Sequence, residues 1–258
     1  MDKYQNNLNS LLHSTGMWRA ASINPGFQPG IPTGYAALDQ LLPGNGWPGQ
    51  GLTELLYRQP GIGELRLLGP GLAHLSQQDK RRILLINPPF IPYAPGLAGL
   101  GIHLSSILVV RPETAADSLW VAEKALASES CCAVLLWPDA IATRDVRRLQ
   151  LAGKSGQCLG ILFRPARTAK QASPAELRIE LKPGPHHDLD NQTCLHLSIL
   201  KRRGGWATEL TLQLQDDLNK RTPYFPELSV PLQSPALPFQ QAFSDPDKTD
   251  RQHGLAIQ

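Results

Sequence analysis

The residue pattern with the clearest chemical meaning is a glycine-rich loop that follows an apolar strand. A working phosphate-binding loop reads G-x-x-x-x-G-K-[ST]. Its backbone N–H groups hold phosphates, its lysine holds the β- and γ-phosphates, and its hydroxyl binds Mg²⁺. Here Gly61 and Gly63 are present, but Glu64 and Leu65 stand where the lysine and the hydroxyl residue belong. A carboxylate would repel a triphosphate, and leucine cannot bind Mg²⁺.

Two interpretations of this degenerate loop are open. One is a surviving nucleotide site, and the other is a glycine turn that close packing of strand and helix requires. Because both charged and hydroxyl contacts to the nucleotide are lost at Glu64 and Leu65, the second is favoured. The sequence therefore predicts a protein without ATPase activity and without a cofactor.

A basic turn is the second candidate site. Lys201, Arg202 and Arg203 are followed directly by Gly204 and Gly205. Three cations beside two glycines form a compact turn that could face an anion, such as a DNA phosphate, or a neighbouring protomer. The same residues could instead be solvated charges that protect a strand edge from aggregation. Both readings stay open.

Three further arginines share one face of an expected helix. Arg144, Arg147 and Arg148 are spaced i, i+3 and i+4, which places them together on the helix surface. They predict either a solvated helix face or a contact with protein or DNA. No metal site is predicted, because His186 and His187 are adjacent on a turn and no further ligand is placed by spacing.

Composition limits the possible classes. The chain has 258 residues, 41% apolar and 18% charged, with a net charge of +3, which indicates one large domain or one domain with tails. The N-terminus lacks an apolar run, and no stretch is long enough to span a bilayer, so neither a signal peptide nor a membrane protein is expected. The cysteines lack metal-binding spacing and are expected to be buried thiols of a cytosolic protein: Cys131, Cys132, Cys158 and Cys194.

The elements that must position these residues follow an α/β pattern. Short apolar runs alternate with helical stretches, which predicts a parallel sheet buried on both faces. After residue 173, strict alternation predicts antiparallel strands that extend one edge. The expected strands are Leu52–Leu56, Ile83–Ile86, Ile107–Val110, Ala133–Trp137 and Leu159–Phe163, then 177–181, 195–199 and 210–214, and the expected helices are Tyr35–Leu42, Glu64–Leu75, Thr114–Ala127 and Thr143–Ala152.

The chain divides into three parts. Residues 1–30 should form an N-terminal helix, Asn6–Trp18, and a connector rich in proline and glycine. Residues 31–214 should form the α/β domain. Residues 215–258 contain repeated prolines among scattered aromatic side chains, and we expect an extended or disordered tail that binds a partner. The segment from Pro88 to Pro95 is expected to be a loop.

The opening of the α/β domain resembles that of RecA-type ATPases. The matching positions are Thr33-Gly34, Leu38-Asp39, Gly46, Pro48, Gly51 and Glu54. This resemblance implies a RecA-like core. A RecA-type site would carry its second acid at the end of the strand Ala133–Trp137. Asp139 lies two residues beyond Trp137 and could reach a metal only if the loop doubled back.

A closer resemblance is to the ImuA proteins, RecA-like accessory factors of damage-induced mutagenesis. It extends over about residues 8 to 214, in the segments 33–39, 46–48, 60–68, 92–95, 147–152, 162–165 and 200–205. It implies a non-catalytic factor of SOS translesion synthesis. The implied partners are a Y-family-like polymerase homologue and an error-prone replicative polymerase, with RecA, single-stranded DNA or a second copy of the chain as further candidates.

The alternative resemblance is to the SulA cell-division inhibitors. It extends over the middle of the chain, from about Pro60 to Pro165, and implies binding to the tubulin-like division protein FtsZ. The SulA proteins are shorter and lack the Thr33-Gly34 opening. They also lack the strand end Lys201–Gly205, so we expect the translesion role, with division inhibition as the alternative. The fold alone decides nothing between the two roles.

Overall fold

The computed structural model describes residues 29–184 and 193–214. Its strands are β1 (Gly51–Tyr57), β2 (Arg82–Ile86), β3 (Ile107–Val110), β4 (Cys131–Leu136), β5 (Leu159–Pro165), β6 (Leu177–Pro183), β7 (Cys194–Lys201) and β8 (Thr208–Gln213). Its helices are α2 (Ala36–Asp39), α3 (Glu64–Gln78), α4 (Ala94–Gly99), α5 (Ala115–Ala127) and α6 (Thr143–Ser155), with the 3₁₀ turns η1 (Leu104–Ser106) and η2 (Ala166–Thr168).

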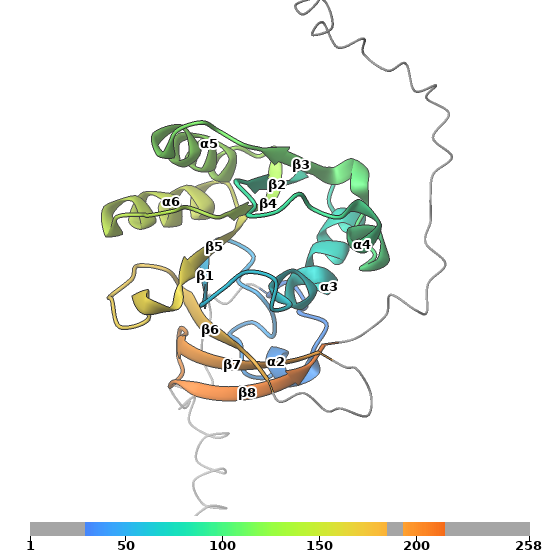
Figure 1. The fold of residues 1–258 in the computed structure, drawn as a ribbon, viewed down its shortest axis with the longest axis vertical. Helices are drawn as coiled ribbons and strands as arrows, with labels where there is room; N and C mark the ends of the chain where they lie inside the picture. The colour runs from blue at the N-terminus through green and yellow to red at the C-terminus, as the bar shows by residue number, and fades with distance from the viewer. Residues whose placement is uncertain (1–28, 185–192, 215–258) are drawn as a thin grey trace, which may run out of the picture. The chain divides into compact units, whose positions relative to one another are not determined.

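In the described residues the strands form one sheet, in the order β3-β2-β4-β5-β1-β6-β7-β8 (Figure 1). Strands β1 to β6 pair in parallel, whereas β6, β7 and β8 pair antiparallel. This confirms the predicted fold class, a mainly parallel sheet flanked by helices with an antiparallel C-terminal extension. The expected strands are all present. Short, continuous apolar runs of this kind are typical of strands that are buried on both faces of a parallel sheet.

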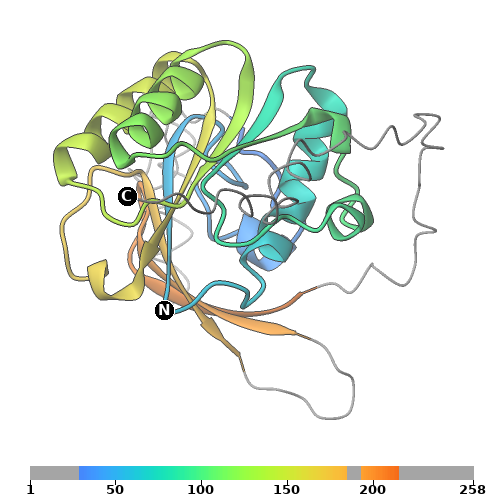
Figure 2. The ribbon, with the colours of Figure 1, turned by 45° about the horizontal axis from the view of Figure 1, so that its top comes forward.

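The two faces of the parallel sheet are covered by different helices. Helices α5 and α6 lie side by side on one face and α3 lies on the other (Figures 1 and 2). Alternation along β2 explains this arrangement: Leu84 and Ile86 pack in the α5–α6 cluster, whereas Ile83 and Leu85 pack in the α3 cluster. Both faces of the central strands are therefore buried.

The edge strand β3 differs from the expectation of a sheet buried on both faces. Leu108 and Val109 are about half exposed, at 48% and 46%. The reason is its position, since β3 pairs only with β2 and is the last strand on that side. The structure also contains α4, which begins inside the segment from Pro88 to Pro95 that the sequence predicted as a loop. Pro95 occupies an early position of this helix, where a missing N–H has no cost.

Several predictions lie outside the described residues. These are the N-terminal helix Asn6–Trp18, most of the connector, the tail 215–258, and the His186-His187 pair. Among the helices that the structure does describe, none combines the length and the apolar character that crossing a bilayer requires.

A buried ion cluster connects β1, β5 and β6. Glu54 is fully buried and lies between two buried arginines. Arg164 Nη1 donates to Glu54 Oε1 at 3.0 Å, and Arg178 Nε donates to Glu54 Oε2 at 2.6 Å. The Ser173 hydroxyl donates to Oε1 at 2.6 Å. Each oxygen of the Glu54 carboxylate thus has an arginine partner, which offsets part of the free-energy cost of burying it.

Buried weak acids predict a loss of stability at alkaline pH. Burial raises the pKa of Cys132 from 9.0 to about 11, and burial followed by the nearby Glu64 charge raises that of Tyr57 from 10.0 to about 12. Burial also raises the pKa of Cys131 and Cys158. Unfolding then releases protons above the ordinary pKa values. The unfolding free energy should therefore fall above about pH 9, by up to about 1.4 kcal/mol per pH unit for each group.

Urea unfolding measured between neutral pH and about pH 10.5 checks this expectation. The variant Cys132→Ala should show a shallower decline than the unchanged chain, because one of the titrating thiols is gone. A stability that is flat across this range would contradict the burial of these groups.

Candidate functional site

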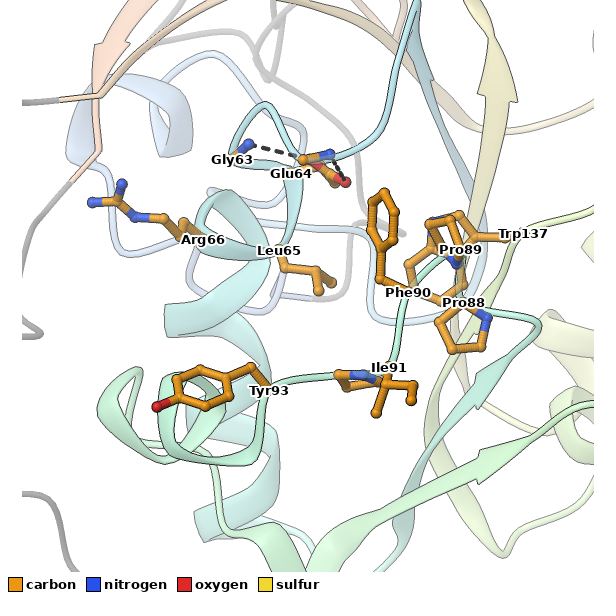
Figure 3. A pocket seen from close by; sticks show the side chains of 12 residues that line it. Gly63, Glu64, Leu65, Arg66, Pro88, Pro89, Phe90, Ile91, Tyr93 and Trp137 are labelled. Atoms are coloured by element: carbon orange, nitrogen blue, oxygen red, sulfur yellow. Dashed lines mark hydrogen bonds between the residues drawn. The ribbon is translucent and has the colours of Figure 1, made fainter.

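The degenerate phosphate loop is occupied by its own carboxylate. Gly61 donates its backbone N–H to Glu64 Oε1 at 2.8 Å, and Gly63 donates to Glu64 Oε2 at 3.1 Å (Figure 3). Glu64 is buried and begins α3, where the helix dipole favours a negative charge. In a working loop, N–H groups of this kind hold phosphates. Glu64 therefore takes up donors that a nucleotide would need.

The backbone conformation explains why glycine remains here. Gly63 has φ of 109°, in the region that favours glycine, and an added Cβ would lie 2.6 Å from a Leu214 side-chain atom. Gly63 is thus required by the turn and its packing, whereas Gly61 is favoured by its φ of 86° alone. That Gly61, Gly63 and Glu64 form a structural remnant of a nucleotide site stays a prediction.

Removing the Glu64 carboxylate should destabilise the loop without creating an ATPase. In Glu64→Ala, two backbone N–H groups lose their acceptor, which should lower the unfolding free energy by about 1–3 kcal/mol. Glu64→Gln keeps one side-chain oxygen and should lose less. Denaturant unfolding measures both effects. ATP turnover by Glu64→Ala that exceeds background would contradict this interpretation.

A cavity of about 250 Å³ opens beside this loop. Its walls come from the start of α3, from Trp137 after β4, and from the segment 88–93 that follows β2 (Figure 3). Leu65, the residue that replaces the Mg²⁺-binding hydroxyl, lines it together with Trp137. The cavity is therefore bordered by the remnant loop on one side and by an apolar loop on the other.

We call residues 88–93 the apolar loop. Three of its side chains are strongly exposed: Phe90 at 64%, Ile91 at 87% and Tyr93 at 74%. Large apolar side chains gathered on one exposed segment are typical of contact surfaces. Sequence reasoning treated this segment only as a proline-rich loop. The contact surface could have been predicted from Phe90, Ile91 and Tyr93, because large apolar side chains are not expected in a loop that only contacts water.

The apolar loop is held in place at its start and at its middle. Asn87, the residue before it, donates its backbone N–H to the Val110 carbonyl at 3.0 Å and its side-chain amide to the Ser118 hydroxyl at 2.8 Å. Arg111 Nη2 donates to the Phe90 carbonyl at 3.1 Å. Prolines restrict the backbone between these points. The exposed side chains are thus presented on a preorganised segment, which lowers the entropy lost on binding.

The predicted basic turn is tied to the rest of the domain. Lys201 Nζ donates to the Ser173 carbonyl at 2.8 Å. Arg202 Nε donates to the Trp206 carbonyl at 3.2 Å, and its Nη1 donates to the Leu41 carbonyl. Arg203 is exposed. Lys201 and Arg202 therefore have a structural role in fastening the β7–β8 hairpin, and a role of the turn in contacts with DNA or protein stays a prediction.

The predicted arginine face is present on α6. Arg144, Arg147 and Arg148 are all exposed. Arg148 pairs with Glu123 of α5 and lies 3.6 Å from Asp145, while Arg144 lies 3.8 Å from Asp145. Only the pair of Arg148 with Glu123 joins α5 and α6, and it lies at the surface, where ion pairs are worth little. A contact of this face with a partner stays a prediction.

Comparison with known proteins identifies cell division inhibitors. No family model matches the chain. A protein named cell division inhibitor SulA from Yersinia enterocolitica is 30% identical over 132 residues, which are 50% of this chain and 77% of that protein. The SulA of Photorhabdus laumondii is 31% identical over 116 residues, which are 45% of this chain and 65% of that protein. The chain thus matches just under two thirds of the Photorhabdus protein.

A solved structure matches over a similar share of this chain. The crystal structure of SulA from Pseudomonas aeruginosa has 27% sequence identity and a TM-score of 0.38, and the match covers 44% of this chain and 97% of that chain.

These relatives correct the expected function. They are named as cell division inhibitors, so the expected role in translesion synthesis and mutagenesis is wrong, and the alternative is the better supported one. The resemblance to ImuA proteins was misleading because one fold can serve many functions. The names describe inhibitors and not enzymes, which agrees with the prediction that the chain is not an ATPase. The polymerase and RecA partners stay untested predictions.

Proposed function

The chain belongs to the SulA family of cell division inhibitors, and from this relationship we propose that it blocks division by binding the tubulin-like protein FtsZ. We further propose that it does so in the response to DNA damage. The binding is stoichiometric. It needs no nucleotide on the inhibitor, because Glu64 already accepts the hydrogen bonds that the backbone N–H groups of the remnant loop can donate.

The observation that supports this proposal is the apolar loop beside the 250 Å³ cavity. A partner that contacts it would bury Phe90, Ile91 and Tyr93. An apolar side chain of that partner would enter the cavity between the loop and α3. Burying apolar surface contributes about 25 cal/mol per Å² before the costs of association, so three large side chains form an adequate centre for an interface.

Sedimentation of FtsZ polymers tests the proposal. Purified FtsZ from the source organism assembles with GTP, and added chain should reduce the sedimented fraction in proportion to its molar ratio to FtsZ. A direct binding measurement by interferometry should saturate at a fixed stoichiometry. FtsZ that assembles normally in the presence of excess chain, with no binding signal, would show that the proposed partner is wrong.

A further inference from the structure

The buried ion cluster carries more positive than negative charge. Two buried arginines share the single carboxylate of Glu54. Arg178 is well satisfied by other groups, because its Nη1 donates to the carbonyls of Ala169 and Gln171 and its Nη2 donates to that of Thr168. The surplus charge therefore falls on Arg164.

Arg164 has unused donors. A guanidinium carries five N–H groups. Arg164 Nη1 donates to Glu54, and its Nη2 makes only a long bond of 3.4 Å to Gln171 Oε1. Within the described part of the chain, Arg164 Nε has no acceptor. Because Arg164 as a whole is only 7% exposed, an anion or water within reach of these donors would complete its hydrogen bonds.

Arg164 also lines a second cavity. This cavity has a volume of about 190 Å³ and lies between the segment after β4 and the segment after β5. We call it the basic pocket. It is lined by Arg164, Arg167, Thr168 and Gln171 from one segment and by Asp139 from the other. Arg167 and Asp139 are both exposed, and neither forms an ion pair with another described residue.

The position of the basic pocket favours a ligand. It lies at the carboxyl ends of the parallel strands β4 and β5, the edge of an α/β sheet where ligands bind. It holds two arginines against one aspartate, and the buried cluster behind it adds the charges of Glu54 and Arg178, which cancel. An anion in the pocket would meet a net positive charge and the unused donors of Arg164.

We propose that the basic pocket binds one oxyanion group, a phosphate or a carboxylate, between Arg164 and Arg167. Planar guanidinium groups match such oxyanions in geometry and give strong charge-assisted hydrogen bonds. The pocket is smaller than the roughly 300–1,000 Å³ of typical sites for whole ligands. It therefore suits a single group, either a free phosphate or the acidic side chain of a binding partner, and excludes a complete nucleotide.

Titration with inorganic phosphate tests this site. Chloride is exchanged for phosphate at constant ionic strength, and binding is followed by thermal shift and by the NMR signal of the Arg164 Nε–H. The unchanged chain should show a saturable shift in both. Arg167→Gln should weaken phosphate binding about tenfold, and Asp139→Asn should strengthen it several-fold, because the first removes a cation from the mouth and the second removes a competing anion.

Arg147→Gln is the matched control, since it removes an exposed arginine of α6 that does not line the pocket. It should bind phosphate like the unchanged chain. A parallel titration with acetate identifies the source of the anion: equal affinity indicates a carboxylate of a protein partner, and much weaker affinity indicates phosphate. Shifts that do not saturate, or that are the same in Arg167→Gln, Asp139→Asn and Arg147→Gln, would overturn the proposal. The test does not involve FtsZ, so either proposal can fail alone.

Discussion

Replacing Glu54 with glutamine should lower the unfolding free energy by about 3–5 kcal/mol. The change preserves the shape of the side chain but removes the charge between Arg164 and Arg178. Two buried guanidinium groups would then lack their counter-charge. Since a domain is stable by only about 5–15 kcal/mol, this is a large fraction of the total. Urea unfolding followed by circular dichroism measures it.

The matched control is Glu176→Gln. Glu176 pairs with Lys154 at 2.8 Å, but the two side chains are 22% and 45% exposed. A pair open to water contributes about 0–1 kcal/mol, so this change should be small. If both variants unfolded at the same urea concentration as the unchanged chain, Glu54 would not be balancing the buried arginines. The comparison separates burial from the mere presence of an ion pair.

The sequence predicted the sheet better than it predicted the site. Runs such as Ile83–Ile86 and Leu159–Phe163 have no other stable environment than a buried strand, and the structure confirms both. The loss of nucleotide chemistry was also readable, because Glu64 and Leu65 are neighbours of a glycine in a known motif. The motif could not predict that the Glu64 carboxylate accepts hydrogen bonds from the backbone N–H groups of Gly61 and Gly63.

The contact surfaces were harder to predict because they depend on distant residues. Arg164 directly follows the expected strand Leu159–Phe163, and nothing in the sequence marks it as buried. In the structure it is buried and donates to Glu54, 110 positions earlier in the chain. In the basic turn the difference between sequence and structure is the reverse. Lys201 and Arg202 looked free in the sequence but reach the carbonyls of Ser173 and Leu41. Charge patterns identify candidates, and only the fold shows which donors are left unused.

Replacing Ile91 with aspartate should weaken FtsZ binding by about 30-fold or more, if the apolar loop is the centre of the interface. Ile91 is 87% exposed, so the change should alter the unfolding free energy by no more than about 0.5 kcal/mol. In a complex, the new carboxylate would be buried without a partner at a site built for apolar contact, which is strongly unfavourable. Polymer sedimentation and direct binding measure the loss.

Leu151→Asp provides the control for this change. Leu151 is also an exposed aliphatic residue, at 60%, but it lies on α6 and does not line the cavity beside the apolar loop. It introduces the same charge in place of an aliphatic side chain and should leave inhibition of FtsZ assembly intact. The reverse result, with inhibition lost in Leu151→Asp and kept in Ile91→Asp, would move the interface from the apolar loop to the α5–α6 face. The predicted contact of the α6 arginines with a partner would then be the one to test, because α6 carries Arg144, Arg147 and Arg148.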